Sequence, residues 1–311
     1  MYNVAGRRGF DLFLSAYAFK FSFPEGINSW VVSEIPTEIV FEMYAERELA
    51  LPAFTGYISR GLLLHIIRRV NPAVAQRFHE AEVMKPYSVT PLWFKSKARG
   101  SEGYLLDPSY PCRVGFRFLR DGDARLVIDY FMEKPAISIF DVPFQVASLS
   151  VSTKDYAEME KAEPLKAFRL VFKSPTYLST LGSPYRCLFP EPQRLFSNLM
   201  RIWNAYSTSK RFGKEEYKAY REWLAKHIGL SEYHLRTTLA RMRERKAMGF
   251  LGWSNYEMDS QDEWNRVTVA LAQFAEYSNI GGNRTGGFGV TRFYPKPQKD
   301  IKSEETSAVN S

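Results

Sequence analysis

Histidine is the side chain best suited to moving protons near neutral pH, and this chain has four histidines among its 311 residues. They are His65, His79, His227 and His234. None of them shares metal-ligand spacing with a carboxylate or another histidine, and no HExxH, HxH or Asp/Glu cluster occurs. No nucleophile elbow is visible either. The sequence therefore disfavours a metal-dependent enzyme and a serine or cysteine triad, and we expect no metal and no cofactor.

Lysine and arginine are concentrated in two segments. Residues 60–99 hold eight Lys or Arg against two Glu, and residues 210–246 hold eleven against five. The whole chain carries a net charge of +8. Clustered cations favour a polyanionic partner, because each neutralised phosphate releases condensed counterions. A solvated basic surface is the alternative, but we consider a nucleic acid the better interpretation.

Histidines and cations are together sufficient for one kind of nucleic-acid chemistry. RNA can be cut without a metal, because its own 2′-hydroxyl can attack the adjacent phosphorus. The protein then needs a base for that hydroxyl, an acid for the leaving 5′-oxygen and a cation for the charge that develops on the phosphate. Histidine can take either proton-transfer role, and lysine or arginine can supply the cation.

A glycine-rich loop, NIGGNRTGGFGV, occupies residues 279–290. A phosphate-binding loop of the P-loop type follows a strand and opens a helix, whereas here a helical segment precedes the loop and a strand follows it. The loop lacks the closing Lys-Ser/Thr as well. Glycines permit positive φ and close backbone approach, and successive amides can form an anion-binding concavity that here contains Arg284. A plain connection with a helix cap at Gly281 accounts for only one or two of the five glycines.

The elements around these residues repeat a pattern of strands and helices. In the first half, alternating apolar residues predict a strand within 10–23, and apolar residues at helical spacing predict helices at 56–70 and 72–81. Asn71-Pro72 marks the restart between the two helices. Two strands, 112–119 and 125–131, are expected to form a hairpin around Asp121-Gly122. A charged segment, 153–164, is the expected domain boundary.

The second half repeats the theme more clearly. We expect strands at 167–173, 250–258 and 286–294, helices at 191–206 and 267–278, and a helical insertion at 208–247. The fold class is therefore α+β, with two tandem ferredoxin-like domains and a glycine-rich loop near the carboxyl terminus. The expected domains are 1–155 and 165–295, followed by a disordered tail at 296–311.

Cysteine content and hydropathy indicate the cellular compartment in which we expect the protein. Cys112 and Cys187 lie far apart, which suggests neither a zinc site nor a disulfide framework. No apolar run approaches the roughly 20 residues that span a membrane, and the first residues lack the features of a signal peptide. We therefore expect a cytoplasmic protein.

Several segments together resemble one protein family. FAEYSNIGGNRTGGFGVTRF is similar to the carboxyl-terminal glycine-rich signature of the RAMP proteins of CRISPR systems. It resembles in particular the endoribonucleases that cut precursor CRISPR RNA within its repeats, the Cas six family. FTGYISRGLLLHIIRRVNP, KPYSVTPL and LFPEPQRLFSNLMRIWNAYS agree with this resemblance, which covers most of residues 10–295. It implies two ferredoxin-like domains side by side, RNA across the cleft and a glycine loop packed near it.

The resemblance also implies catalytic residues. In the family a histidine in or just after the first helical region is followed a few residues later by a lysine, and this pattern falls on His79 and Lys85. The tyrosine usual in the first helix is replaced by Leu64, next to His65. His65 either substitutes for that tyrosine or is an ordinary helix residue. His227 and His234 are expected to be structural or to contact RNA.

Binding residues are assigned from charge, and aromatic side chains such as Tyr57, Tyr87 or Trp93 could stack on bases. The expected RNA-binding residues are Arg60, Arg68, Arg69, Lys95, Lys97, Arg236, Arg241, Arg243 and Arg245. The glycine-rich loop is a separate candidate site, with the residues Gly281, Gly282, Asn283, Arg284, Gly286, Gly287 and Gly289.

The resemblance predicts a metal-independent endoribonuclease that cleaves precursor CRISPR RNA and leaves a 2′,3′-cyclic phosphate and a 5′-hydroxyl. Its expected partners are CRISPR repeat RNA and crRNA, with other effector subunits and a homodimer as further possibilities. The principal alternative is a non-catalytic RAMP subunit that binds crRNA in a CRISPR effector complex. A sequence-tolerant RNA-binding protein unrelated to CRISPR is a third possibility, against which the glycine signature argues.

Overall fold

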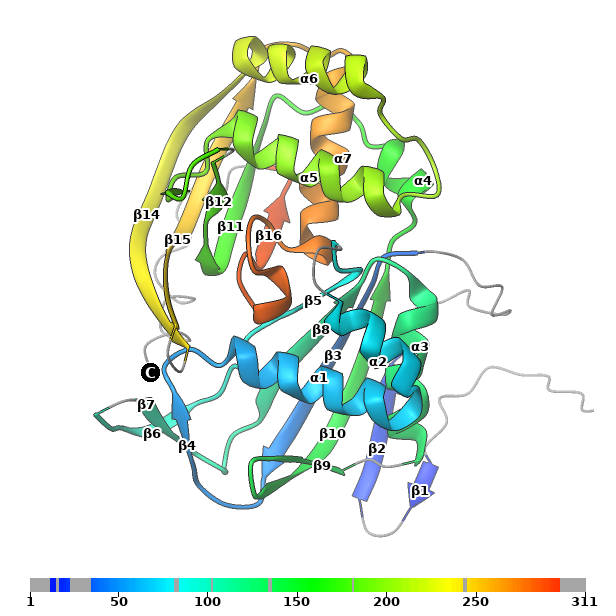
Figure 1. Ribbon diagram of the computed structural model, residues 1–311, viewed down its shortest axis with the longest axis vertical. Coiled ribbons are helices and arrows are strands. Elements are labelled where there is room, and N and C mark those ends of the chain that lie inside the picture. The colour runs from blue at the N-terminus through cyan, green and yellow to red at the C-terminus, as the bar shows by residue number, and fades with distance from the viewer. Residues whose placement is uncertain are drawn as a thin grey trace, which may run out of the picture.

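The computed structural model describes residues 12–14, 17–22, 35–80, 84–101, 103–133, 136–180, 182–242 and 245–296. These residues form two lobes, one above the other in Figure 1. Each lobe has its own hydrophobic core. One cluster of buried side chains runs from Ile39 to Val151, and the other comprises Leu119 together with residues from Tyr156 to Ile280.

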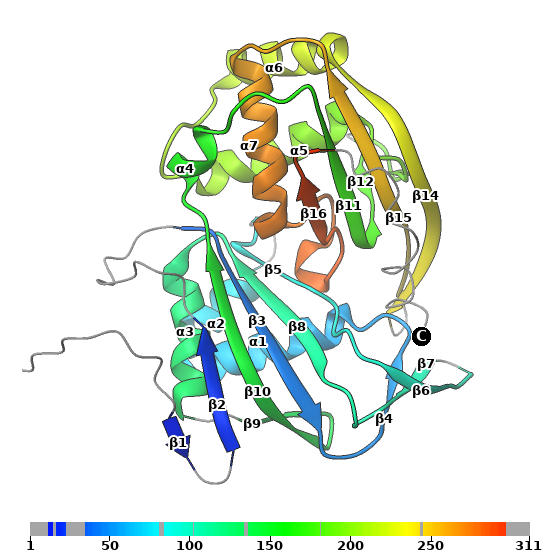
Figure 2. The ribbon, with the colours of Figure 1, turned by 180° about the vertical axis from the view of Figure 1, so that it is seen from behind.

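The first lobe is a ferredoxin-like βαββαβ unit. Its elements in chain order are β3 (Thr37–Ala45), α1 (Gly56–Val70), α2 (Pro72–His79), β5 (Tyr87–Val89), β8 (Cys112–Phe118), α3 (Asp121–Glu133) and β10 (Val142–Thr153). The strands pair antiparallel in the order β10-β3-β8-β5, which is the fourth, first, third and second strand of the unit. The three helices lie in front of this sheet in Figure 1, and the strands lie in front in Figure 2.

Shorter strands extend this lobe. β1 (Leu12–Leu14) and β2 (Tyr17–Ser22) continue the sheet beyond β10, and β9 (Ala136–Ile139) pairs with β10. β1 and β2 fall within the strand predicted at 10–23. β4 (Leu49–Pro52), β6 (Ser96–Arg99) and β7 (Gly103–Leu106) form a separate three-stranded sheet.

The second lobe repeats the unit. Its elements are α4 (Tyr156–Glu160), β11 (Ala167–Thr176), β12 (Leu178–Ser179), β13 (Arg186–Cys187), α5 (Pro192–Tyr206), α6 (Lys214–His227), β14 (Ile228–Met242), β15 (Arg245–Met258), α7 (Glu263–Ser278), the 3₁₀ turn η1 (Arg284–Gly286) and β16 (Thr291–Tyr294). The sheet order is β14-β15-β11-β16, all antiparallel, which is again a ferredoxin-like arrangement. The predicted fold class, two such units in tandem, is confirmed.

Local patterns explain why the central elements form where they were predicted. Phe168, Leu170 and Phe172 alternate along β11 and are all buried, as period two requires of a strand with one covered face. On α1, Leu62, Ile66 and Ile67 are buried at helical spacing. Asn71 ends α1 and begins α2, where its side chain accepts a hydrogen bond from the Val74 N–H at 3.2 Å.

The predicted strand at 125–131 is wrong, because this segment belongs to helix α3. Its apolar residues Ala124, Val127, Ile128 and Phe131 follow helical spacing and are buried in the first core. The run Leu126-Val127-Ile128 resembles a buried strand over a short window, which periodicity alone cannot distinguish from a buried helix. Asp121-Gly122 begins this helix instead of forming a hairpin turn. The correction supplies the second helix of the first ferredoxin-like unit.

The helical insertion predicted at 208–247 is correct only for α6. The segment that follows is strand β14, which pairs with β15 from Ile228↔Met258 to Met242↔Arg245. The β-branched pair Thr237-Thr238 is compatible with either state, and the long ladder with β15 decides between them. Figure 1 shows this hairpin descending from the second lobe to the start of α1.

The domain limits remain a proposal. We propose the division into residues 1–155 and 165–295, which the two separate cores support. Within the predicted boundary segment, α4 already buries Tyr156 and Met159 in the second core. The predicted tail, apart from the exposed Lys296, lies outside the described residues.

Candidate nucleic-acid interface

A groove with a volume of about 1820 Å³ lies between the outer surface of α1 and the tip of the β14–β15 hairpin. Helix α1 contributes Tyr57, Arg60, His65 and Arg69 to the lining. The buried residues Leu63, Ile66 and Ile67 of the same helix pack in the first core. The further polar and aromatic lining includes Arg99, Tyr104, Phe140, Arg241 and Lys246.

The groove has a single sign of charge. Its lining contains five Lys or Arg and one His, and no Asp or Glu is among the described residues that line it. Exposed cations along a groove attract a polyanion, and a nucleic acid can lie in such a groove with its phosphates next to the cations. Among the predicted binding residues, Arg60, Arg69 and Arg241 line this groove, and His65 lines it as well. Lys246 is not among the predicted binding residues. It lines the groove because it lies near the tip of the β14–β15 hairpin.

Other predicted binding residues lie elsewhere. The Lys95 ammonium stacks 3.6 Å from the Tyr110 ring centroid, and Lys97 pairs with Glu48 at 2.6 Å. Arg68 and Arg236 are exposed but do not line the groove. Arg243 lies outside the described residues, and only the backbone of Arg245 is described.

Among the aromatic and remaining histidine side chains, too, some line the groove and others do not. Tyr57 is partly exposed and lines the groove, whereas Tyr87 is fully buried and unavailable for stacking. His227 lies at the end of α6, with its Nδ1 2.9 Å from an Asp259 carboxylate oxygen. His234 lies on β14 beside the Trp253 ring.

Lys85 contacts the end of α2 at the residue that follows His79. His79 is the last residue of that helix and is exposed, while Lys85 is half-buried. The Lys85 ammonium donates to the carbonyl of Glu80, the residue directly after His79. Burial lowers the pKa of Lys85; the charge of Glu80 opposes this and that of Arg60 adds to it. Arg60 also lines the groove that holds His65, so a groove cation lies close enough to Lys85 for the two charges to interact.

The glycine loop packs its backbone against the start of α1. A Cβ on Gly56 would lie 2.1 Å from the Gly286 carbonyl oxygen. Gly287 has φ +82°, and a Cβ there would lie 2.8 Å from the Gly56 Cα. Close backbone approach between the lobes therefore requires glycine on both sides. The loop also reaches the groove rim, where the Asn283 amide donates to the Tyr57 hydroxyl at 3.0 Å.

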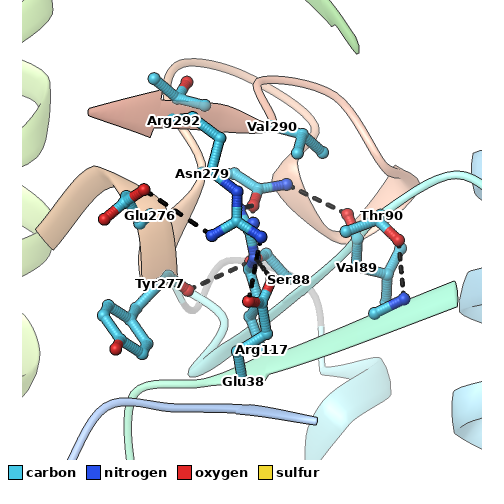
Figure 3. Close-up of polar contacts among 12 residues, drawn as sticks. Glu38, Ser88, Val89, Thr90, Arg117, Glu276, Tyr277, Asn279, Val290 and Arg292 are labelled. Atoms are coloured by element: carbon cyan, nitrogen blue, oxygen red, sulfur yellow. Dashed lines mark hydrogen bonds and ion pairs between the residues drawn. The ribbon is translucent and has the colours of Figure 1, made fainter. Parts of the chain in front are cut away.

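A buried polar network joins the two sheets beside the loop (Figure 3). Arg117 on β8 donates from Nε to Glu38 and from Nη1 to the Asn279 side-chain oxygen, both at 2.7 Å. Arg292 on β16 approaches Glu38 at 3.4 Å and Glu276 at 3.7 Å. We call these five residues the inter-lobe network. It links the first lobe to the glycine loop, and sequence patterns missed it because its members lie far apart in the chain.

The inter-lobe network makes stability depend on pH. Burial alone would raise the pKa of Glu38, but Arg117 and Arg292 outweigh it and lower that pKa. A carboxylate with a lowered folded-state pKa stabilises the protein above its unfolded-state pKa, and this stabilisation is lost as pH falls through the folded-state value. Burial raises the pKa of Glu276, which therefore acts in the opposite sense.

We expect Glu38→Gln to reduce the free energy of unfolding at pH 7 and to reduce it less as the pH falls below about 4.5. Urea unfolding of both proteins from pH 7 down to pH 3.5, followed by circular dichroism, measures this difference. A gap between wild type and variant that stays constant over the range would contradict the role given to Glu38.

The groove predicts a salt-dependent affinity for RNA. Arg69→Ala and Lys246→Ala should each weaken RNA binding and reduce the slope of log Kd against log salt concentration by about one. Filter binding of a repeat RNA at five KCl concentrations measures the slope. The matched control is Lys97→Ala, because Lys97 is exposed but paired outside the groove. Equal losses in all three variants would show that general charge, not the groove, determines binding.

In the part of the chain that the structure describes, no three His, Cys, Asp or Glu side chains gather as metal ligands would. Among the same residues, no helix is both long and apolar enough to cross a membrane.

Comparison with known proteins agrees with this architecture. The family described as CRISPR-associated endoribonuclease Cas6 matches residues 170–291. A Streptococcus thermophilus protein named CRISPR-associated endoribonuclease Cas6 is 24% identical over 122 residues, which are 39% of this chain and 48% of that protein. The match thus spans about half the length of this curated relative.

Two solved structures show the same fold over most of the chain. A Cas6 product complex superposes with a TM-score of 0.69 and 21% identity, covering 83% of this chain and 99% of the other. A Cas6-related protein from Pyrococcus furiosus superposes with a TM-score of 0.59 and 12% identity, covering 84% and 100%. The second lobe of this chain thus matches the Cas6 family model, and the whole chain shares its fold with solved Cas6 structures.

Proposed function

We propose that this chain is an endoribonuclease that cleaves precursor CRISPR RNA within its repeats, without a metal, by attack of the RNA 2′-hydroxyl. The observation that carries the proposal is the cationic groove with no described carboxylate in its lining; one of its cations, Arg60, lies close enough to Lys85 for its charge to lower the pKa of that lysine. The groove provides phosphate contacts over an extended strand, and the end of α2 provides a proton-transfer group beside a cation.

The proposed roles follow from the chemistry of the step. A histidine removes the proton of the 2′-hydroxyl or protonates the leaving 5′-oxygen, and the Lys85 ammonium stabilises the charge on the phosphate. The oxygen of the 2′-hydroxyl forms a bond to phosphorus as the bond to the 5′-oxygen breaks. The products are therefore a 2′,3′-cyclic phosphate and a 5′-hydroxyl. We assign one of the proton transfers to His79, and His65 in the groove is the alternative histidine.

Single-turnover cleavage of a labelled repeat RNA in excess EDTA tests this proposal. We expect cleavage at one position in the repeat, and a 2′-deoxy nucleotide at the 5′ side of that position should stop cleavage while RNA affinity is retained. A 2′-deoxy nucleotide two positions away is the control. Continued cleavage of the 2′-deoxy substrate, or cleavage only with added divalent metal, would overturn the mechanism.

A second candidate function is a non-catalytic RAMP subunit that binds crRNA. Leu64 favours it, because Leu64 stands where the resembled family has a tyrosine and packs against the first core. Wild-type protein that binds its repeat RNA tightly but never cleaves it would support this candidate. Homodimer formation, association with other effector subunits and a cytoplasmic location remain predictions.

A further inference from the structure

The segment Met84–Pro86 carries Lys85, and all three of its main-chain carbonyls accept hydrogen bonds. The Tyr206 hydroxyl donates to the Met84 carbonyl. Arg284 Nη2 donates to the Lys85 carbonyl at 3.0 Å, and the Leu119 N–H donates to the Pro86 carbonyl at 2.8 Å. Two of the three donors, Tyr206 and Arg284, are side chains of the second lobe. The lobe opposite the proposed catalytic residues therefore holds the backbone that carries one of them.

We propose that Arg284 is a positioning residue that fixes the Lys85 segment for RNA cleavage. This inference rests on the endoribonuclease function proposed above. It gives the glycine loop a role beyond binding: the loop orients a guanidinium toward the first lobe.

The surroundings of Arg284 suit this role. Its side chain is buried, and its described partners are main-chain carbonyls: Nη1 donates to the Ser278 carbonyl at 2.7 Å and Nη2 to that of Lys85. Burial lowers its pKa to about 10, so the guanidinium remains charged near neutral pH. A charged donor held by two carbonyls gives stronger and more directional hydrogen bonds than a neutral one.

The hydrogen bond from Arg284 to the Lys85 carbonyl can affect the position of the Lys85 ammonium, because both groups belong to the same residue. Arg284 fixes the Lys85 carbonyl, while the Lys85 ammonium donates to the Glu80 carbonyl next to His79. Loss of the Arg284 contact frees the backbone of Lys85 and lets the ammonium move away from the end of α2. Because cleavage requires the cation at the reacting phosphate, a displacement of about 1 Å is enough to slow the step by up to roughly 10²-fold.

A variant that keeps the charge tests the proposal. Arg284→Lys retains a cation but cannot donate to both carbonyls in the same geometry. At saturating enzyme, we expect the single-turnover cleavage rate to fall about 10- to 100-fold with Kd for the repeat RNA nearly unchanged. Tyr206→Phe, which frees only the Met84 carbonyl, should give a smaller loss in the same direction, and it serves if Arg284→Lys fails to fold.

A double-mutant cycle separates positioning from simple structural support. If Arg284 acts through Lys85, adding Arg284→Lys to Lys85→Ala should cost little more than Lys85→Ala alone. The control is Ser88→Ala, which removes a 3.2 Å contact with Asn279 between the lobes but does not touch the Lys85 segment. Its effect, if any, should multiply with that of Lys85→Ala.

The outcomes distinguish this inference from the proposed function. Unchanged cleavage in both Arg284→Lys and Tyr206→Phe overturns the positioning role of Arg284, and so does a loss that multiplies with that of Lys85→Ala. In either case, cleavage by the wild-type protein still supports the proposed endoribonuclease function. Wild-type protein that binds repeat RNA without cleaving it overturns both. A Kd that rises while the rate at saturation is retained shows that Arg284 serves binding alone, and this also overturns the proposal.

Discussion

Replacing His79 with alanine should slow single-turnover cleavage of a repeat RNA by roughly 10²–10⁴-fold, the range typical of a lost proton-transfer group. His79 is exposed at the end of α2, so its removal opens no core cavity and should leave the free energy of unfolding within about 0.5 kcal/mol of wild type. Affinity for RNA should change little, because we assign most of the binding to the groove cations. Rates at saturating enzyme and Kd values by filter binding measure the two effects separately.

The matched control is Gln76→Ala, an exposed change on the same helix that should leave the rate unchanged. His65→Ala provides the contrasting test, because His65 lies in the groove and not at the end of α2. A large loss in His65→Ala with normal cleavage by His79→Ala would assign the chemistry to the groove histidine. Normal cleavage by both variants would remove histidine from the mechanism.

The largest expected effect on stability comes from Arg117→Ala. Arg117 is fully buried and bonds to both Glu38 and Asn279. Its removal leaves the buried Glu38 carboxylate without its main partner, and breaking one side of a buried pair typically costs 3–5 kcal/mol, so we expect a loss of about that size. Urea unfolding followed by circular dichroism measures this loss. The dependence of the unfolding free energy on urea concentration also shows whether the two lobes unfold in separate transitions.

Arg113→Ala on the same strand is the control, because Arg113 pairs with Glu42 and both side chains are largely exposed. It should cost at most about 1 kcal/mol. Equal costs for the two arginine variants would contradict the central role of the inter-lobe network. Replacing Arg117 and Glu38 together by leucine should recover much of the stability, since a buried pair can be exchanged for apolar packing at little net cost.

Periodic patterns predicted those elements in which one face is buried against a neighbour. The alternation of β11, the apolar stripe of α1 and the Asn71-Pro72 restart are local features, and the structure confirms all three. The glycine signature in 279–290 is a local feature too, and the Cas6 family model matches the segment that contains it. α3 and β14 were mispredicted because short apolar or β-branched runs fit two states, and only sheet pairing and core packing decide between them.

In the candidate site, too, the sequence predicts some features and the tertiary structure decides others. Residue type and charge by themselves predict a polyanionic partner for the clustered cations and favour the histidines as proton-transfer groups. Only the tertiary structure decided that Arg60, Arg69, Arg241 and Lys246 share one groove, while Lys95 and Lys97 lie elsewhere. Contacts between distant segments, such as Arg284 with the Lys85 carbonyl, leave no periodic trace in the sequence. They depend on how the two lobes pack, and packing is a property of the whole chain rather than of any local window.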